Sequence, residues 1–263
     1  MYKILFFGDI VGAIGRKAVI AALPGLREKY SPDFVIANVE NLAHGSGVTP
    51  KTLTDLDNAG FDAYTSGNHA WANPVGIPCF TDERWKKRLL RPANIMPKMP
   101  GQGSTVIEKA GVKIGLINLS GQLFMKEEAR NPFLLLDEML AQTKTADISI
   151  IDFHAEATSE KEAFGLYADG KVTAILGTHT HVPTADAKIL PAGIAYQTDV
   201  GRSGSYQSVL GFEKNSAIKA FLEPGHMSFD LPEDGQTEVN CALLTVDLDM
   251  KKAMSLDSLR IIC

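Results

Sequence analysis

The chain has 263 residues, of which 45% are hydrophobic and 22% are charged, a balance that is ordinary for a folded globular protein and excludes a largely disordered one. Its formal net charge of -5 argues against a broad basic surface for nucleic acid, because such binding draws on clustered lysine and arginine. A small phosphorylated substrate remains compatible with this charge, since bound metal ions can supply positive charge.

The first part of the chain alternates short β-rich runs with helical segments. Pro24-Gly25 should kink or end the first helix, because proline removes a backbone donor and clashes with the preceding turn. Thr49 is a natural N-cap for the second helix, with Pro50 at the first helical position. The predicted strands are 3–7, 34–37 and 61–66, and the predicted helices lie around Ile14 to Leu26 and from Thr49 to Gly60.

The second part continues this alternation and then becomes rich in strands. The Ser-x-x-Glu spacing that starts at Ser159 is that of a capping box, and it predicts a helix to about Ala168. Segments 105–108 and 112–117 should form a hairpin, and 132–143 an amphipathic helix. Further strands are predicted at 148–153, 172–176, 189–190, 194–196 and 241–247, the last of them pairing with 258–262. This order predicts an α/β protein with mixed sheets.

Nothing in the sequence divides the chain, so we predict a single domain, 1–263. There is no linker rich in proline, glycine or serine and no internal repeat. The first apolar run is too short for a signal peptide, and no later run approaches the ~18 residues of a membrane span, so we expect a cytoplasmic protein without a membrane partner. Cys79, Cys241 and Cys263 are far apart, which favours reduced thiols. The sequence leaves a homo-oligomer open.

Polar side chains with metal-ligand chemistry follow five of the apolar runs. In open α/β sheets, functional groups collect beyond the carboxyl ends of the strands. In extended backbone, His179 and His181 would leave the same face and point into one site. Each residue also has an ordinary explanation, such as a turn or a helix cap, but one shared metal site accounts for all five. The groups are Asp9, Glu40-Asn41, Asn68-His69, His154 and His179/His181.

The types of ligand indicate what kind of metal site this is. Carboxylate, amide oxygen and imidazole without thiolate favour Mn, Fe or Zn. Seven or eight ligand atoms are too many for one tetrahedral zinc, and the natural arrangement is two ions that share one carboxylate. Two ions about 3.5–4 Å apart are a standard device for displacement at phosphate esters, with a metal-bridging hydroxide as the nucleophile.

Several of these motifs resemble the calcineurin-like metallophosphoesterases: Gly8-Asp9, Gly67-Asn68-His69, the lone His154 and Gly177-Thr178-His179-Thr180-His181. Segments 38–41, 152–161, 178–182 and 198–201 more closely resemble the YmdB-type bacterial branch, and this likeness runs from residue 3 to about residue 211. The resemblance implies a central two-sheet β-sandwich flanked by helices, with the site at the carboxyl ends of the strands. It also implies two divalent metal ions, iron and/or manganese with zinc as an alternative, and activity on small cyclic nucleotides, of the 2',3'-cyclic and also the 3',5'-cyclic kind.

The resemblance also assigns roles by position. Asp9, Asn41 and His181 would hold one ion, Asn68, His154 and His179 the other, and Glu40 would bridge them. His69 would lie just outside the metals and either protonate the leaving oxygen or stabilise charge on the phosphoryl group. Thr178 is a candidate for an additional substrate contact. His44 is a second candidate for a substrate contact, with a solvated loop residue as the alternative.

Two departures from the broad superfamily pattern matter for the site. The usual Asp-x-His of the first motif is Asp9-Ile10-Val11 here, so Asn41 must compensate for a missing imidazole. The acid that commonly follows Asn-His is Ala70 here, so a group that orients His69 must come from elsewhere. Both differences leave the identity of the metals open.

We therefore expect a metal-dependent phosphoric diester hydrolase that acts on a small phosphodiester or cyclic nucleotide. One alternative is a regulatory or scaffold protein in which the metal site is structural, because intact ligands indicate binding rather than turnover. The other is a phosphomonoesterase or nucleotidase, which differs only in the shape of its pocket. Residues 212–263 receive no role from the sequence.

Overall fold

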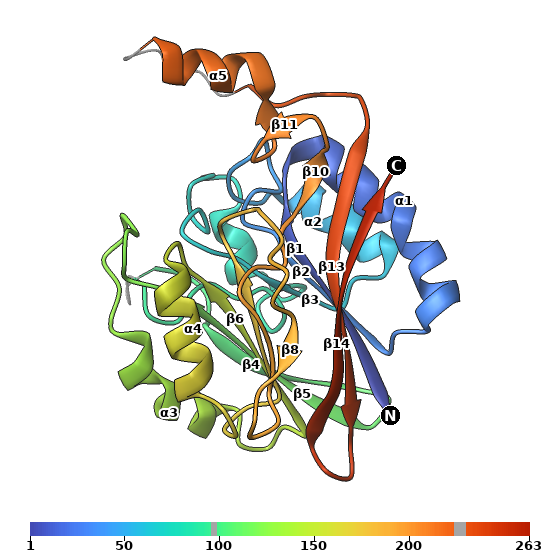
Figure 1. Ribbon diagram of the computed structural model, residues 1–263, viewed down its shortest axis with the longest axis vertical. Coiled ribbons are helices and arrows are strands. Elements are labelled where there is room, and N and C mark those ends of the chain that lie inside the picture. The colour runs from blue at the N-terminus through green and yellow to red at the C-terminus, as the bar shows by residue number, and fades with distance from the viewer. Residues whose placement is uncertain (96–98, 224–229) are drawn as a thin grey trace.

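The computed structural model describes residues 1–95, 99–223 and 230–263. Two six-stranded sheets pack face to face, and helices cover their outer faces (Figure 1). The first sheet has the order β14 (Lys252–Ile262), β13 (Thr237–Asp247), β10 (Arg202–Ser205), β1 (Tyr2–Ile10), β2 (Phe34–Asn38) and β3 (Ala63–Thr65). The second has the order β4 (Ser104–Lys109), β5 (Val112–Ser120), β6 (Ile148–His154), β7 (Ala174–Thr178), β9 (Ala195–Gln197) and β8 (Lys188–Ile189). The predicted α/β fold with a two-sheet sandwich flanked by helices is confirmed.

The alternation of side chains along the strands creates separate apolar layers. In β1, Ile4 and Phe6 belong to the core between the sheets, whereas Leu5 and Phe7 belong to the core under the helices. Each fully buried side chain of this size contributes about 1.5–3 kcal/mol to folding. The first sheet is covered by α1 (Gly12–Tyr30) and α2 (Pro50–Ala59), and the second by α3 (Pro132–Gln142) and α4 (Thr158–Tyr167).

The remaining elements lie outside this four-layer arrangement. A single-turn 3-10 helix, η1 (Ile77–Phe80), interrupts the connection between β3 and β4. The hairpin of β11 (Ser208–Val209) and β12 (Phe212–Glu213) leads into α5 (Lys214–Leu222), which stands clear of the sandwich at the top of Figure 1. Among the described residues, no helix combines the length and apolarity needed to cross a membrane.

Pro24-Gly25 was predicted to kink or end the first helix, and it does not end the helix. The helix α1 continues through Pro24 to Tyr30. Pro24 is exposed, whereas Leu23 and Leu26 are buried in the core under the helices. Proline inside a helix costs about 3 kcal/mol, and two buried leucines at about 1.5–3 kcal/mol each offset that cost.

The predicted capping box at Ser159 is also wrong, although the helix does end next to Ala168. The N-cap of α4 is Ala157, which makes no side-chain cap hydrogen bond, and Ser159 is exposed inside the first turn. Glu160 is the residue of this turn that is buried, and its carboxylate accepts hydrogen bonds from the backbone N–H groups of Gln122 and Leu123. A local spacing rule does not detect this partner, because it lies 38 residues away.

The strand directions determine where the polar strand ends meet. In the first sheet, β1, β2 and β3 run parallel, and in the second sheet β5, β6, β7 and β9 run parallel. Parallel strands place their carboxyl ends at one edge of a sheet. The two sheets bring these edges together, and the predicted ligands lie there.

Candidate metal centre

The seven predicted metal ligands converge from both sheets. Asp9 lies at the end of β1, and Glu40 and Asn41 follow β2 directly. Among the described residues, two groups of three side chains could hold a metal ion, and the ligand atoms within each group lie within 4.8 Å of one another. Both groups contain Glu40, the carboxylate predicted to be shared. The groups are Glu40, His154 and His179, and Asp9, Glu40 and His181.

The first group surrounds the Nε2 atom of His154. This nitrogen lies 3.0 Å from Asn68 Oδ1, 3.1 Å from Glu40 Oε2 and 3.0 Å from Nδ1 of His179. His154 and Glu40 are fully buried. Four lone-pair atoms at these distances repel one another unless a proton or a cation lies among them, and the set combines imidazole, amide and carboxylate.

The second group contains a buried carboxylate oxygen that lacks a partner. Asp9 Oδ1 accepts no hydrogen bond from the described residues, while Asp9 Oδ2 accepts one from the backbone N–H of His179. His181 Nε2 lies 4.0 Å from Asp9 Oδ1 and 3.2 Å from Asn41 Oδ1. Burying a carboxylate oxygen without compensation is costly, so a cation at this point fits the side chains. Asn41 Oδ1 thus lies beside an imidazole of this group, where the sequence expected an additional ligand.

Each of the three histidines has its other ring nitrogen fixed by an acceptor. His154 Nδ1 lies 2.8 Å from Thr178 Oγ1, His181 Nδ1 lies 2.8 Å from the carbonyl oxygen of Leu210, and His179 Nε2 lies 3.2 Å from Glu156 Oε2. A proton on that nitrogen leaves the lone pair of the opposite nitrogen facing the centre. Metal-binding histidines usually have such a partner, which sets the tautomer and the ring orientation. All three rings are therefore arranged as metal ligands would be.

The charges at the centre favour a cation. Burial raises the pKa of Asp9 to about 6. Burial lowers the pKa of His154, but the charges of Glu40, Asp9 and Asp152 outweigh it and raise the pKa to about 9. A positive charge is thus stabilised where the first group of ligands meets. Burial, followed by the charge on His154, lowers the pKa of His179 to about 3, so this ring is neutral, as metal binding requires.

Thr178 lies behind His154 rather than in an open part of the site. It is completely buried, and its hydroxyl donates a hydrogen bond to Asp152 Oδ1 at 2.7 Å while facing His154 Nδ1. Since the hydroxyl proton is used on Asp152, the oxygen accepts from the Nδ1–H of His154. Orienting His154 fits this burial better than the substrate contact expected from the sequence.

The segment with His179 and His181 is not extended, so the sequence argument from alternating side chains is wrong. The strand β7 ends at Thr178, and the φ angles of His179 and His181 are 99° and 66°. Positive φ is strained for these residues and persists only where the surroundings enforce it. The turn sends His179 to one ligand group and His181 to the other.

A buried ion pair holds this strained turn. Lys161 Nζ donates to the carbonyl oxygen of Thr178 at 2.7 Å and to Asp199 Oδ2 at 2.8 Å. The same Asp199 oxygen accepts hydrogen bonds from the backbone N–H and the hydroxyl of Thr180. Lys161 and Asp199 are 1% and 0% exposed. Sequence analysis gave neither residue a role, and the available signal was two charged residues inside the motifs 152–161 and 198–201.

His69 lies at the rim of the centre. Its Nδ1 is 3.3 Å from Glu40 Oε1 and 3.3 Å from Asn41 Nδ2, and its side chain is 42% exposed. The hydrogen bond to Glu40 raises the pKa of His69. Glu40 therefore provides the orienting acid that Ala70 does not.

A pocket of about 430 Å³ opens beside His69 and Asn68. Its wall is completed by His179 and by the segment from Phe124 to Glu127. This space adjoins the first ligand group and can admit a small phosphorylated molecule. The pocket therefore gives a substrate access to the candidate metal centre.

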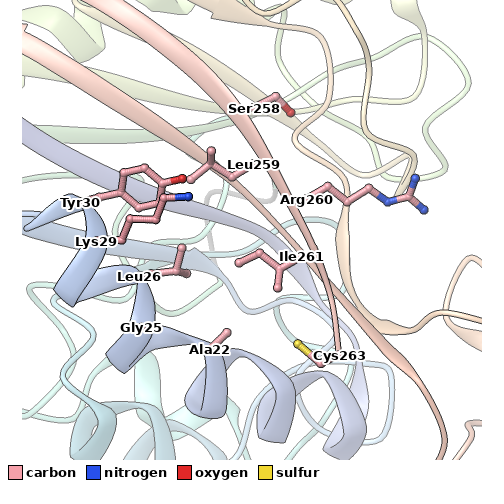
Figure 2. A pocket seen from close by; sticks show the side chains of 10 residues that line it. All are labelled: Ala22, Gly25, Leu26, Lys29, Tyr30, Ser258, Leu259, Arg260, Ile261 and Cys263. Carbon is pink, nitrogen blue, oxygen red and sulfur yellow. The ribbon is translucent and has the colours of Figure 1, made fainter.

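The structure does not bring His44 into this pocket. His44 is exposed and lines a different cavity of about 470 Å³, together with Lys17 and segment 230–233. Another cavity, of about 510 Å³, lies between α1 and β14, where Leu26 faces Leu259 and Ile261 (Figure 2). Among the residues that the structure describes, no acidic side chain or imidazole lines this cavity beside α1. Neither cavity is lined by any residue of the two candidate ligand groups.

Comparison with known proteins shows which proteins the chain resembles. The model of a family described as YmdB-like protein matches residues 5–259. A protein of Bacillus subtilis (strain 168) named 2',3'-cyclic-nucleotide 2'-phosphodiesterase is 43% identical over 260 residues, which cover 98% of this chain and 97% of that protein. A Mycoplasma pneumoniae protein named "Putative phosphatase/phosphodiesterase" is 38% identical over 266 residues, which cover 99% of this chain and 93% of that protein. The crystal structure of a hypothetical protein from Thermus thermophilus matches with a TM-score of 0.91 at 36% identity, over 99% of both chains.

Proposed function

Because the chain belongs to the YmdB-like family, we propose that it is a metal-dependent phosphodiesterase that hydrolyses 2',3'-cyclic nucleotides. The prediction of a hydrolytic phosphoesterase is confirmed by relatives of 43% and 38% identity whose names describe phosphodiesterase and phosphatase activity. The substrate class is the part we propose. The observation that carries it is a pair of ligand groups sharing Glu40, next to a pocket lined by His69.

The donor atoms suggest how the centre would be occupied. Glu40 would contact two divalent cations, and its two flanking sets of ligands would each hold one. We expect iron and/or manganese, with zinc as an alternative, because the set has carboxylate, amide and imidazole donors but no thiolate. When bound, two such cations lower the pKa of water and stabilise negative charge on a phosphoryl group. The proposed sets are Asp9, Asn41 and His181 for one cation, and Asn68, His154 and His179 for the other.

The residues of the chain supply orientation and a proton. The acceptors Thr178, Leu210 and Glu156 hold the three histidine rings, so little reorganisation is needed when a substrate arrives. His69 reaches the pocket without belonging to either ligand group, and Glu40 and Asn41 fix its Nδ1 side. An imidazole N–H in this position can protonate the ribose oxygen that leaves when the cyclic ester opens.

The test is hydrolysis of 2',3'-cyclic AMP by protein reconstituted with Mn or Fe. We expect cleavage of the bond between phosphorus and the 2' oxygen, which leaves the phosphate on the 3' oxygen, and loss of activity after chelation. Chromatography distinguishes 3'-AMP from 2'-AMP. A preparation that is free of metal and equally active would overturn the proposal.

The same preparation separates the two alternatives. Faster release of phosphate from 3'-AMP than ring opening of 2',3'-cyclic AMP would favour a phosphomonoesterase. A scaffold role would leave the cellular phenotype intact when His69 is replaced, because that change should spare metal content and partner binding. Activity on 3',5'-cyclic AMP, measured alongside, shows whether the wider substrate range implied by the family resemblance applies.

A further inference from the structure

The segment that follows β5 forms the outer wall of the pocket beside His69. It includes Phe124, whose side chain is 84% exposed and which lines the pocket together with Asn68, His69 and His179. Phe124 belongs to none of the three apolar cores. A large aromatic residue in this position has no packing role in the described part of the chain and adjoins the candidate metal centre.

The base of this segment is tightly anchored. The buried Glu160 of α4 accepts hydrogen bonds from the backbone N–H of Gln122 at 2.9 Å and of Leu123 at 3.1 Å. The backbone N–H of Gly121 donates to the carbonyl oxygen of His154, and Gln122 Nε2 donates to the carbonyl oxygen of residue 129, which closes the loop. The loop that holds Phe124 is therefore fixed at its base by hydrogen bonds, one of them to the backbone of the proposed ligand His154.

The conformation of Phe124 is itself costly. Its φ is 63°, which is the left-handed region that bulky residues rarely adopt. Strain of this kind costs about 1–3 kcal/mol and clusters at ligand-binding sites. Phe124 thus combines an exposed apolar side chain with a strained backbone, and it lines the space that a substrate would enter.

Glu127 adds an unused acceptor to the same wall. Its Oε1 lies 3.5 Å from Asn68 Nδ2, and its Oε2 is buried and accepts no hydrogen bond from the described residues. A buried carboxylate oxygen is expected to have a donor. Phe124 and Glu127 both line the pocket, so an aromatic ring and a carboxylate with an unpartnered oxygen lie close to the residues proposed to bind metal.

We propose that Phe124 and Glu127 form the nucleoside subsite of this enzyme. The base stacks on the ring of Phe124, and Glu127 Oε2 accepts a hydrogen bond from an N–H or O–H group of the nucleoside. Stacking on an aromatic ring is sequence-tolerant, because every base has a π face, so this subsite accepts different bases. The inference rests on the proposed phosphodiesterase function and specifies how its substrate is selected.

The experiment compares 2',3'-cyclic AMP with ethylene phosphate, a five-membered cyclic phosphodiester that has neither base nor hydroxyl. The ratio of kcat/KM between the two substrates measures what the nucleoside contributes. In Phe124→Ala this ratio should fall about 5- to 150-fold, which corresponds to the ~1–3 kcal/mol of base–aromatic stacking. The loss should appear in KM rather than in kcat, because the base lies away from the reacting bond.

Four further variants make the result specific. Phe124→Tyr keeps an aromatic face and should retain the wild-type ratio. Phe124→Asn suits a positive φ but has no ring, so it should behave like Phe124→Ala if stacking, rather than loop geometry, is what matters. Leu134→Ala removes another apolar side chain, 82% exposed on α3 and outside the pocket lining, and serves as the matched control. Glu127→Gln should lower the ratio as well, since it replaces a charged acceptor.

The outcomes separate this inference from the proposed function. If wild-type protein hydrolyses both substrates and Phe124→Ala leaves the ratio unchanged, the subsite is refuted and the phosphodiesterase function stands. If Phe124→Asn retains the wild-type ratio, stacking is refuted. If the wild-type protein, loaded with metal, hydrolyses neither substrate, both the function and the subsite fall.

Discussion

The ion pair between Lys161 and Asp199 should be the most consequential interaction outside the proposed metal ligands. Replacing Lys161 by Met keeps a similar apolar stem but leaves the Asp199 carboxylate buried without its cation. Three neutral donors remain on Asp199, from the N–H and the hydroxyl of Thr180 and from the N–H of Gly201. The carbonyl oxygen of Thr178 loses the ammonium donor that lies 2.7 Å from it.

The expected loss in the free energy of unfolding is large compared with the total stability of a typical protein. Removing one partner of a buried ion pair costs about 3–5 kcal/mol, against a total free energy of unfolding of about 5–15 kcal/mol. The double variant Lys161→Met/Asp199→Asn carries no unpaired charge, so we expect it to be less destabilised than the sum of the single variants, by about 0.5–3 kcal/mol. Lys86→Met is the control, because its pair with Glu83 is exposed and should cost at most about 1 kcal/mol.

Urea unfolding followed by circular dichroism measures these free energies. A chelator is kept in every sample, so that differences in metal binding do not add to the free energy of unfolding. Metal content after reconstitution is then measured separately by mass spectrometry, and it should fall in Lys161→Met because the turn with His179 and His181 loses its anchor. If Lys161→Met cost no more than Lys86→Met, the ion pair would not be what holds this turn.

Three further predictions concern the centre itself. Glu40→Gln should lower metal occupancy more than Asn41→Ala, because a carboxylate neutralises charge between two cations; two fully occupied ions in native mass spectrometry of Glu40→Gln would contradict the bridge. Gly67→Ala places a Cβ against Glu40 Oε2 and His154 Nε2, so it should reduce metal binding, which isothermal titration with Mn can measure. His69→Ala should retain both metals and lose ~10²–10⁴-fold in turnover of 2',3'-cyclic AMP. Its loss on bis(p-nitrophenyl) phosphate, whose leaving group is stable as an anion, should be smaller, and equal losses would leave His69 only an electrostatic role.

The fold and the location of the candidate site could be predicted from the order of apolar runs and from the polar residues that follow them. Parallel strands put their carboxyl ends at one edge, so polar residues directly after apolar runs were expected to meet, and Asp9, Glu40 and His154 do. The predicted hairpin is also confirmed, since β4 and β5 pair in antiparallel fashion around residues 110 and 111. These features depend on local periodicity and on strand direction, and both can be predicted from short stretches of sequence.

The features that the sequence did not disclose depend on partners far along the chain. Glu160 looked like part of a helix start, but its carboxylate anchors a loop 38 residues away. Lys161 received no role from the sequence, and it is buried against Asp199. The His179–His181 segment was expected to be extended, because its local sequence contains no signal for a left-handed backbone. That conformation is held by Lys161 and Asp199, which lie elsewhere in the chain. Phe124 carried no motif at all, and its position acquires meaning only beside His69.

The two sheets contribute different halves of the centre, so the site depends on how they are held together. A buried network joins them directly behind the ligands: Asp152 of β6 accepts hydrogen bonds from Asn38 Nδ2 of β2 at 2.9 Å and from the hydroxyl of Thr65 of β3 at 2.5 Å. Asp152 also accepts from Thr178, which orients His154. One carboxylate therefore fixes both the register of the sheets and the tautomer of a ligand. A shift of one sheet against the other would break these hydrogen bonds and separate Glu40 from His154, so this polar network, together with the apolar core between the sheets, fixes the geometry of the centre.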